Sequence, residues 1–269
     1  MIAELEGVAL SGAALVGIGF AASLLAGMCT FVGALPVLLV RTITERTQNL
    51  MLGFGAGVMM AASIFSLILP ALDVAADSGI GDVAAVSIVI LGLLLGAVSL
   101  SLVHHYAPHE HFIIGHEGPP TARLARVWLF IIAITLHNFP EGLAVGVGFG
   151  GGNVPNGIAL AIGIGLQNMP EGLVVAVALI SQGYTKGRAL WVSLLTGLVE
   201  PVGGLIGVVA VTLAQSLLPW ALAFSAGAMI FVISDEIIPE THRSAYATQA
   251  TFSLMIGFAV MMFLDVTLS

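Results

Sequence analysis

The sequence predicts an all-α integral membrane protein with eight transmembrane helices and both termini on the outer side of the membrane. The chain of 269 residues is 58% hydrophobic and only 8% charged, and its mean hydropathy is +1.09. That balance leaves too little polar surface to cover a soluble domain. The prediction also rests on a set of long apolar stretches and on the uneven placement of the basic residues between them.

The apolar stretches give the number of crossings. A helix needs about 20 mostly apolar residues to cross the hydrocarbon core. Eight stretches meet that requirement, at residues 8–40, 50–72, 83–103, 127–147, 157–181, 189–213, 219–239 and 250–268. The first is longer than one crossing requires, so we expect it to tilt or to project from the membrane. Residues 1–269 are therefore interpreted as one polytopic membrane domain.

The first stretch is interpreted as a membrane span and not as a cleaved leader. Met1–Glu6 is acidic, so the basic n-region of a signal peptide is missing. The single cysteine, Cys29, lies in the same stretch, which excludes a disulfide within the chain.

The seven basic residues orient the spans. They are Arg41, Arg46, Arg123, Arg126, Lys186, Arg188 and Arg243. All seven fall in or at the edges of the first, third, fifth and seventh connections. The N-terminus, the even-numbered connections and the C-terminus carry no basic residue, although together they hold Glu4, Glu6, Asp73, Asp77, Asp82 and Asp265. By the positive-inside rule the four basic connections face the cytosol and both termini face outward. We expect the membrane to be the cytoplasmic membrane.

One short phrase occurs twice, in the fourth and fifth stretches. Residues 137–142 read HNFPEG, and residues 167–172 read QNMPEG. Ionisable residues at the bilayer centre cost about 2.5–3.5 kcal/mol each on insertion scales, so they are rarely placed there for stability. They need a partner, and the residue types indicate a metal ion.

Helical spacing supports a metal site. Residues i, i+1 and i+4 point in directions about 100° apart or less, so His137, Asn138 and Glu141 share one face, with the glutamate between the other two. The second copy repeats this arrangement with Gln167, Asn168 and Glu171. A central carboxylate flanked by two different donors can bridge two cations. The motif therefore predicts a binuclear site.

Each motif also contains a proline, and a third proline follows Glu200 in the sixth stretch. Proline has no N–H, so we expect the helices to kink or break at Pro140, Pro170 and Pro201. His137 and Gln167 lie ten residues into their stretches and Glu200 eleven, which is mid-membrane. Seven candidate ligands therefore converge there: His137, Asn138, Glu141, Gln167, Asn168, Glu171 and Glu200.

A weaker echo links the second and seventh stretches. Residues 54–59 read FGAGVM, and residues 224–229 read FSAGAM. The two spans run in opposite directions, which is typical of inverted-repeat transporters. Helices 1–3 and 6–8 would then form an inverted repeat around helices 4 and 5. Matches of small residues are common among membrane helices, so this one carries little weight alone.

At the paired motif the sequence resembles the ZIP family (the Zrt/Irt-like divalent-metal transporters), and within it the prokaryotic GufA-like branch. The resemblance covers nearly the whole chain. It implies transport of Zn²⁺ and similar ions toward the cytosol, through a binuclear site between helices four and five. It also implies an elevator-like motion, in which a four-helix bundle slides against the other helices, and a homodimer.

The resemblance also implies how the ligands divide. The first metal would be surrounded by His137, Glu141, Gln167 and Glu171. The second would be surrounded by Asn138, Asn168 and Glu200, together with both bridging glutamates. Other members carry His at the Gln167 position and Asp at the Asn168 position, so this chain departs from them with a neutral pair.

The donor set limits the ion. One imidazole with carboxylates and amides suits Zn²⁺, Cd²⁺, Fe²⁺, Co²⁺ or Mn²⁺, whereas Cu⁺ prefers thiolates. Zn²⁺ is the expected substrate, chiefly from the resemblance. The expected partners are divalent metal ions and the lipid bilayer, with no nucleic acid.

Further residues have two readings each. The third connection (residues 104–123) is either a cytosolic metal-loading loop or an ordinary solvated loop; its histidines are His104, His105, His109, His111 and His116. A metal path toward the cytosol, as opposed to a solvated helix end, would use Asp235, Glu236, Glu240 and His242. Met59 offers a thioether to that path, although packing in the core explains it better.

Other classes of function fit less well. An intramembrane metalloprotease needs a motif such as H-E-x-x-H, which the chain lacks. A di-metal carboxylate enzyme uses Glu-x-x-His pairs, whereas the order here is His-x-x-x-Glu. We therefore expect no enzyme. A selective divalent-metal channel stays open as an alternative, because a sequence does not separate passive conduction from alternating access.

Overall fold

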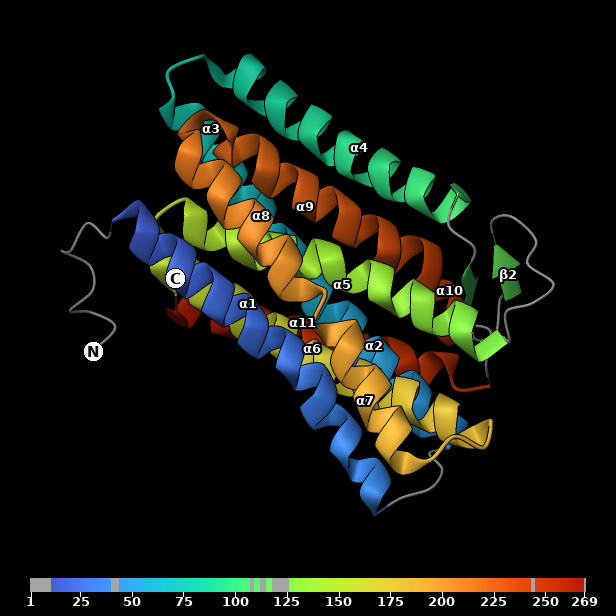
Figure 1. The fold of residues 1–269 in the computed structure, drawn as a ribbon. Helices are drawn as coiled ribbons and strands as arrows, with labels where there is room; N and C mark the ends of the chain where they lie inside the picture. Colours follow the sequence, from blue (N-terminus) through green and yellow to red (C-terminus); the bar gives the residue numbers. More distant parts are fainter. Residues whose placement is uncertain are drawn as a thin grey trace.

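The computed structural model is a bundle of long helices with a small β-hairpin at one end (Figure 1). It describes residues 11–39, 44–106, 109–111, 115–117, 126–242 and 245–268. Seven helical stretches of the described chain are long and apolar enough to cross a membrane: Gly12–Leu38, Glu45–Asp77, Asp82–Val103, Val154–Ser181, Lys186–Leu213, Gln215–His242 and Ala247–Leu268. A further long helix, α5 (Arg126–Gly150), packs among them. The prediction of a helical, multi-pass membrane protein is confirmed.

The elements follow the predicted stretches to within a few residues. In the first half of the chain they are α1 (Gly12–Ala34), the 3-10 turn η1 (Leu35–Leu38), α2 (Glu45–Ala61), the π-helix η2 (Ala62–Ile68), α3 (Leu69–Asp77), α4 (Asp82–Tyr106), β1 (His109–His111), β2 (Gly115–Glu117) and α5. In the second half they are α6 (Val154–Ser181), α7 (Lys186–Gly197), α8 (Glu200–Leu213), the 3-10 turn η3 (Gln215–Leu217), α9 (Leu218–Val232), the π-helix η4 (Ile233–Ile237), α10 (Ile238–His242) and α11 (Ala247–Leu268).

The prolines act differently from the prediction. Helices α5 and α6 continue through Pro140 and Pro170, so the breaks expected in these two helices are wrong. The sixth stretch does break, at Leu198–Val199, and Glu200 begins the new helix α8 with Pro201 in its first turn. Proline is tolerated there because the first N–H groups of a helix have no partner within the helix.

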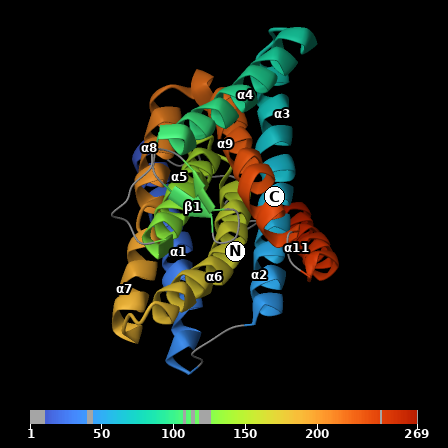
Figure 2. The same cartoon turned by 90° about the vertical axis from the view of Figure 1, so that its right-hand side faces the viewer.

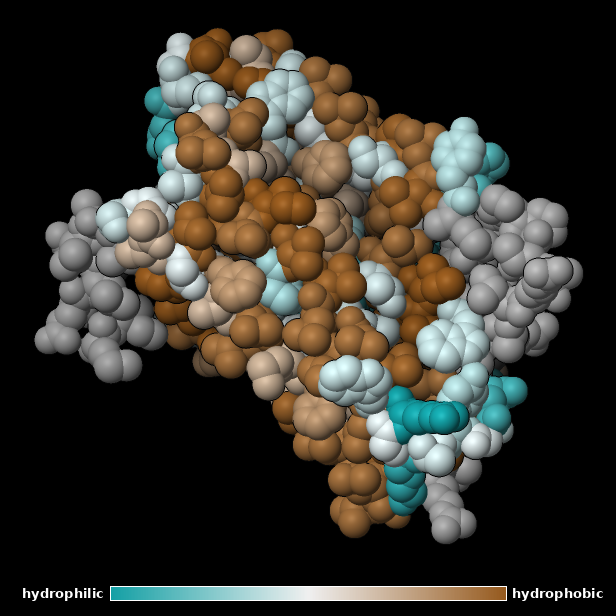
Figure 3. Space-filling model, viewed as in Figure 1, coloured by the Kyte–Doolittle hydropathy of each residue, from teal (hydrophilic) through white to brown (hydrophobic). Residues whose placement is uncertain are grey.

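The two ends of the bundle differ in what they carry. The beginning of α1, the end of α11 and the turn between α3 and α4 lie at one end, whereas the β-hairpin and the turn between α6 and α7 lie at the other (Figure 1). The apolar surface between the two ends is broad and almost continuous (Figure 3). Lys186 and Arg188, at the start of α7, belong to the same end as the hairpin.

Glycines bring four helices into backbone contact. A Cβ atom on Gly27, Gly33, Gly142 or Gly203 would overlap the main chain of a neighbouring helix. These contacts join α1, α5, α6 and the α7–α8 stretch into one group, as small residues do in membrane bundles. Glycines of a second set join α2 to α11 and α4 to α9 (Figure 2).

Contacts between the groups are different in kind. The space beside Gly55 of α2 is filled by the Gln167 side chain of α6, and the space beside Gly163 of α6 by the Met261 side chain of α11. Side chains can rearrange with less cost than two backbones in direct contact. The molecule is thus divided into a tightly joined four-helix group and helices that pack against it through side chains.

The glycine contacts are repeated within the chain. Two contacts of the four-helix group have a counterpart elsewhere in the group. The matched residues of α5 and α6 differ by 30 positions, and the matched residues of α1 and the α7–α8 stretch differ by 170. The matched pairs are Gly33–Met169 with Gly203–Phe139, and Gly172–Thr30 with Gly142–Glu200. Gly27 and Gly197, also 170 positions apart, contact each other. Outside this group, Gly57–Leu254 matches Gly227–Leu93, and Gly257–Phe54 matches Gly96–Phe224. The weak echo at residues 54–59 and 224–229 therefore marks a structural repeat.

Both members of that echo run into a π-helical segment that comes before a proline, at Pro70 and Pro239. The carbonyl of Ser66, four residues before Pro70, accepts a hydrogen bond from the Asn156 amide at 3.1 Å. The Ser66 hydroxyl donates to Asp265. Asp265 is buried in α11.

The third connection contains a short antiparallel hairpin. Its register pairs His109 with Glu117, Glu110 with His116, and His111 with Gly115. Strand β1 lies against α5 (Figure 2). This part of the loop is therefore ordered by backbone hydrogen bonds.

Candidate metal centre

The seven predicted ligands lie in the interior of the bundle. Three come from α5, three from α6, and Glu200 is the first residue of α8. None of the seven residues is more than 5% exposed. Because the α7–α8 stretch is broken at Leu198–Val199, the first turn of α8 faces the two motifs from within the four-helix group.

Asn168 links three helices at this centre. Its amide nitrogen donates to Glu200 Oε1 at 2.7 Å and to the Ala26 carbonyl of α1 at 2.9 Å. Its amide oxygen accepts a hydrogen bond from Gln167 Nε2 at 2.8 Å. The predicted second-metal residues Asn168 and Glu200 are therefore in direct contact.

Asn138 is held in the matching way. Its amide nitrogen donates to the Thr196 carbonyl at 2.9 Å, which leaves its amide oxygen, Oδ1, available as a ligand. The two carbonyls that accept these hydrogen bonds, those of Ala26 and Thr196, belong to residues 170 positions apart. The repeat therefore also positions the two asparagines.

Six oxygen atoms of the seven side chains have no hydrogen-bond donor in the described part of the chain. They are Asn138 Oδ1, Gln167 Oε1, both carboxyl oxygens of Glu141, Glu171 Oε2 and Glu200 Oε2. An unpaired buried acceptor costs about 1–3 kcal/mol, and more when it is charged. A cation removes that cost, and oxygen donors with an imidazole suit a divalent metal.

The carboxyl groups also act on one another. Glu141 lies close enough to Glu171 and Glu200 for their negative charges to repel its own. The same holds between Glu200 and Glu171. Like charges in a desolvated interior repel unless a cation or protons lie between them. The electrostatics of the centre therefore favour a bound cation.

His137 has a neighbour that the ligand prediction did not include. Its Nε2 lies 2.7 Å from Glu236 Oε1. Glu236 is buried and comes from the π-helix η4. It was predicted only as a path residue, although an acidic residue within the apolar stretch 219–239 is as unusual as Glu200. A metal at His137 therefore competes with Glu236 or shares it.

Three of the seven candidate ligands are amides: Asn138, Gln167 and Asn168. In the described part of the chain, no three His, Cys, Asp or Glu side chains lie close enough to hold an ion by themselves. In this arrangement His137 is turned to Glu236, while Gln167 and Asn168 bond to each other. The structure thus brings all seven residues into one buried region but does not close them around a single point.

The remaining path residues lie at different depths. Met59 is buried in the hydrophobic core, which agrees with a packing role. Glu240 is buried in α10, four positions beyond Glu236, while Asp235 is exposed. His242 Nε2 lies 3.1 Å from the Thr251 hydroxyl of α11. Acidic groups therefore continue from His137 toward the hairpin end of the bundle.

The loop histidines are described only in part. His105 is exposed and packs edge-on against Tyr106, with ring centroids 5.0 Å apart. The side chains of His104, His109, His111 and His116 lie outside the described residues.

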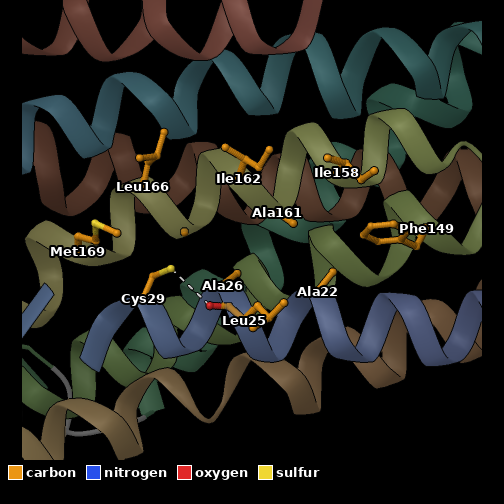
Figure 4. Close-up of a pocket in the computed structure, with 11 residues that line it drawn as sticks. Ala22, Leu25, Ala26, Cys29, Phe149, Ile158, Ala161, Ile162, Leu166 and Met169 are labelled. Carbon is orange, nitrogen blue, oxygen red and sulfur yellow. Dashed lines mark hydrogen bonds between the residues drawn. The ribbon is translucent and has the colours of Figure 1, made fainter. Parts of the chain in front are cut away.

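A cavity of about 360 Å³ lies between α1 and α6 (Figure 4). Its lining is apolar, with Leu25, Ile162 and Leu166 among the residues, and the Cys29 thiol donates to the Leu25 carbonyl at 3.4 Å. Its lining residues include none of the seven candidate ligands, and the candidate ligands of α6 lie on another face of that helix.

The fold and the centre together define a multi-pass membrane protein whose central helices enclose donor groups suited to divalent cations. Comparison with known proteins identifies the family. The family model described as ZIP zinc transporter matches residues 109–265. The chain belongs to the ZIP family.

Three relatives show how far the likeness extends. The zinc transporter GufA of Myxococcus xanthus is 47% identical over 252 residues, which cover 94% of this chain and 99% of that protein. The zinc transporter ZIPB of Bordetella bronchiseptica is 49% identical over 240 residues, 89% of this chain and 77% of that protein. The human zinc transporter ZIP11 is 35% identical over 320 aligned positions, 89% of this chain and 94% of that protein.

Proposed function

We propose that this protein transports Zn²⁺ across the membrane toward the cytosol through a binuclear site at mid-membrane. The observation that carries the proposal is the set of six buried oxygens on α5, α6 and α8 to which no group in the described residues donates a hydrogen bond. The relatives named zinc transporters supply the ion. The family is one of transporters and not of enzymes.

The proposed ligands divide as the motif and the resemblance suggest. His137, Glu141, Gln167 and Glu171 hold the first metal, and Asn138, Asn168 and Glu200 join the two glutamates around the second. The contact between Asn168 and Glu200 supports the second group. The contact between His137 and Glu236 suggests where the first metal goes next: Glu236 accepts the ion, and Glu240 follows toward the cytosol.

The four-helix group supports an elevator-like motion. All seven proposed ligands belong to α5, α6 and α8, which glycines join closely with α1. The contacts of this group with α2 and α11 run through side chains such as Gln167 and Met261. The group would carry the metals as one body against the other helices, and we extend the proposal to a homodimer.

The function is tested by uptake into proteoliposomes. Zn²⁺ is expected to enter with saturating kinetics, and Cd²⁺, Fe²⁺, Co²⁺ and Mn²⁺ are assayed in parallel because the same donors accept them. Zn²⁺ uptake no faster than leakage into protein-free vesicles, from protein that still binds Zn²⁺, would contradict the transport function.

A channel is the alternative, and the same vesicles separate the two. A carrier moves by conformational change, so its uptake saturates and rises steeply with temperature. A channel would show a far higher flux with a shallow temperature dependence.

We further propose eight spans, with α5 as the fourth, and outward termini. In a chain carrying Cys29→Ser, single cysteines placed at 41–49, 105–122 or 182–188 are expected to react only with cytosolic reagents, because all basic residues lie on that side. Cysteines near Asp77 or Gly151 are expected to react only from outside. A cytosolic label at Asp77 would overturn this topology.

The His-bearing connection is proposed to tune delivery of the metal. Replacing His104, His105, His109, His111 and His116 with serine is expected to leave Zn²⁺ at the central site and transport measurable. Strands β1 and β2 of this connection lie at one end of the bundle (Figure 1), so we do not expect them to form a site between the central helices. Complete loss of uptake in folded protein would place the loop in the central path.

A further inference from the structure

Thr30 of α1 occupies the place in the repeat that Glu200 occupies in α8. The two residues are 170 positions apart. Each presents its main-chain carbonyl to the glycine that ends a motif, Thr30 to Gly172 and Glu200 to Gly142. Thr30 is thus the counterpart of a proposed metal ligand, in a helix to which no ligand has been assigned.

The surroundings of the two residues correspond as well. The Asn168 amide donates to the Ala26 carbonyl in α1, and the Asn138 amide donates to the Thr196 carbonyl in α7. Glu200 contacts Asn168. By the same repeat, Thr30 belongs on the Asn138 side of the centre.

The Thr30 hydroxyl is buried and unpaired. Its residue is 0% exposed, and Oγ1 has no hydrogen-bond partner in the described chain. Threonines in helices usually donate to the carbonyl four residues earlier, as Thr135 and Thr212 do here. For Thr30 that carbonyl belongs to Ala26, and it already accepts from the Asn168 amide. The hydroxyl is therefore left to serve another partner.

The direction of the hydroxyl indicates that partner. Oγ1 would lie 2.9 Å from a Cβ atom placed on Gly197, so it points across to α7. Gly197 directly follows Thr196, whose carbonyl orients the Asn138 side chain. Asn138 Oδ1 is itself one of the buried oxygens without a donor. The Thr30 hydroxyl thus lies against the segment of α7 that orients the Asn138 side chain.

We propose that Thr30 Oγ1 is an eighth ligand of the centre and binds the second cation from the side opposite Glu200. The inference rests on the proposed binuclear site. A hydroxyl oxygen is a neutral donor, and it would add to a set of oxygen donors and one imidazole that suits divalent metals. Three carboxylates then face two divalent cations, and a threonine in place of a fourth carboxylate completes the coordination without adding the charge that would slow release.

The test measures metal binding to the purified protein in detergent. Calorimetry gives the dissociation constants for Zn²⁺, and the measurement is repeated with Cd²⁺. Thr30→Val keeps the shape of the side chain and removes the hydroxyl. The dissociation constant of the second metal is expected to rise about tenfold, the low end of the loss typical for a partner of a metal site, with the first metal unchanged. Thr30→Ser is expected to restore binding. Ser23→Ala, which removes another buried unpaired hydroxyl of α1, is the matched control and should change neither site.

Thermal unfolding separates a ligand from a structural residue. Without metal, Thr30→Val is expected to unfold at the same temperature as the unaltered protein or higher, because the hydroxyl has no hydrogen bond to lose. The rise in unfolding temperature on adding Zn²⁺ is expected to shrink. A lower metal-free unfolding temperature with unchanged affinity would overturn the proposal, since the hydroxyl would then be structural.

Glu200→Gln, measured alongside, distinguishes the two ways to fail. If it weakens the second metal while Thr30→Val leaves both affinities within about twofold, Thr30 is not a ligand and the binuclear site stands. If the unaltered protein binds a single metal, the binuclear site itself is wrong and the Thr30 inference falls with it.

Discussion

Zn²⁺ uptake is expected to fall to near background when Glu141 or Glu171 is replaced with alanine. Each glutamate lies between two other donors of its motif, so each change would remove a ligand from both cations of the proposed site. Breaking a buried ion pair costs about 3–5 kcal/mol, roughly a hundredfold or more in affinity. Calorimetry should show both metals weakened, and vesicle uptake should be lost.

A surface glutamate provides the control for this experiment. Glu45→Ala, at the exposed start of α2, removes the same charge far from the motifs and should leave uptake unchanged. A folded Glu141→Ala or Glu171→Ala protein that keeps both metals would show that these carboxylates do not bridge.

The second large effect is a separation of the two sites. His137→Ala is expected to disable the first site and to leave a second metal visible by anomalous diffraction. Glu200→Gln is expected to weaken the second site about tenfold or more, to spare the first, and to reduce transport more mildly. In the unaltered protein, binding should release protons, because carboxyl and imidazole ligands must be deprotonated to hold a metal.

The contact with Glu236 gives this experiment an internal check. His137→Ala removes the partner of a buried carboxyl group, so Glu236→Gln should be combined with it to keep the protein folded. Loss of both metals in Glu200→Gln with neither lost in His137→Ala would show that the proposed division of ligands is wrong.

The spans and the motif were predictable from local patterns. Apolar length sets the number and limits of membrane helices almost independently of packing, because every backbone group in lipid must be bonded within its own helix. The i, i+1, i+4 spacing places His137, Asn138 and Glu141 on one face without any tertiary information. Glu200 could be added from its depth alone.

The effect of the prolines was not predictable in the same way. Proline frees a carbonyl wherever it stands in a helix, but neighbouring groups decide whether the helix breaks. Pro140 and Pro170 lie in helices that continue, whereas the sixth stretch stops at Leu198–Val199, just before Pro201. In the second stretch the Asn156 amide donates a hydrogen bond to the carbonyl of Ser66. The hydroxyl of the same serine donates to the buried Asp265.

The sequence by itself determined the helical membrane fold and the approximate ends of the long helices. It also singled out seven candidate ligands, six in the paired motifs and Glu200. Each of these follows from composition or from spacing along one helix. Only the tertiary structure placed Glu236 against His137 and brought the Asn168 amide to the carbonyl that the Thr30 hydroxyl would usually bond. It also revealed the repeat, through glycine contacts whose matched residues differ by 170 and by 30 positions. Those features depend on which helix faces meet. Helix faces in a membrane meet through backbone and side-chain packing that no local pattern encodes.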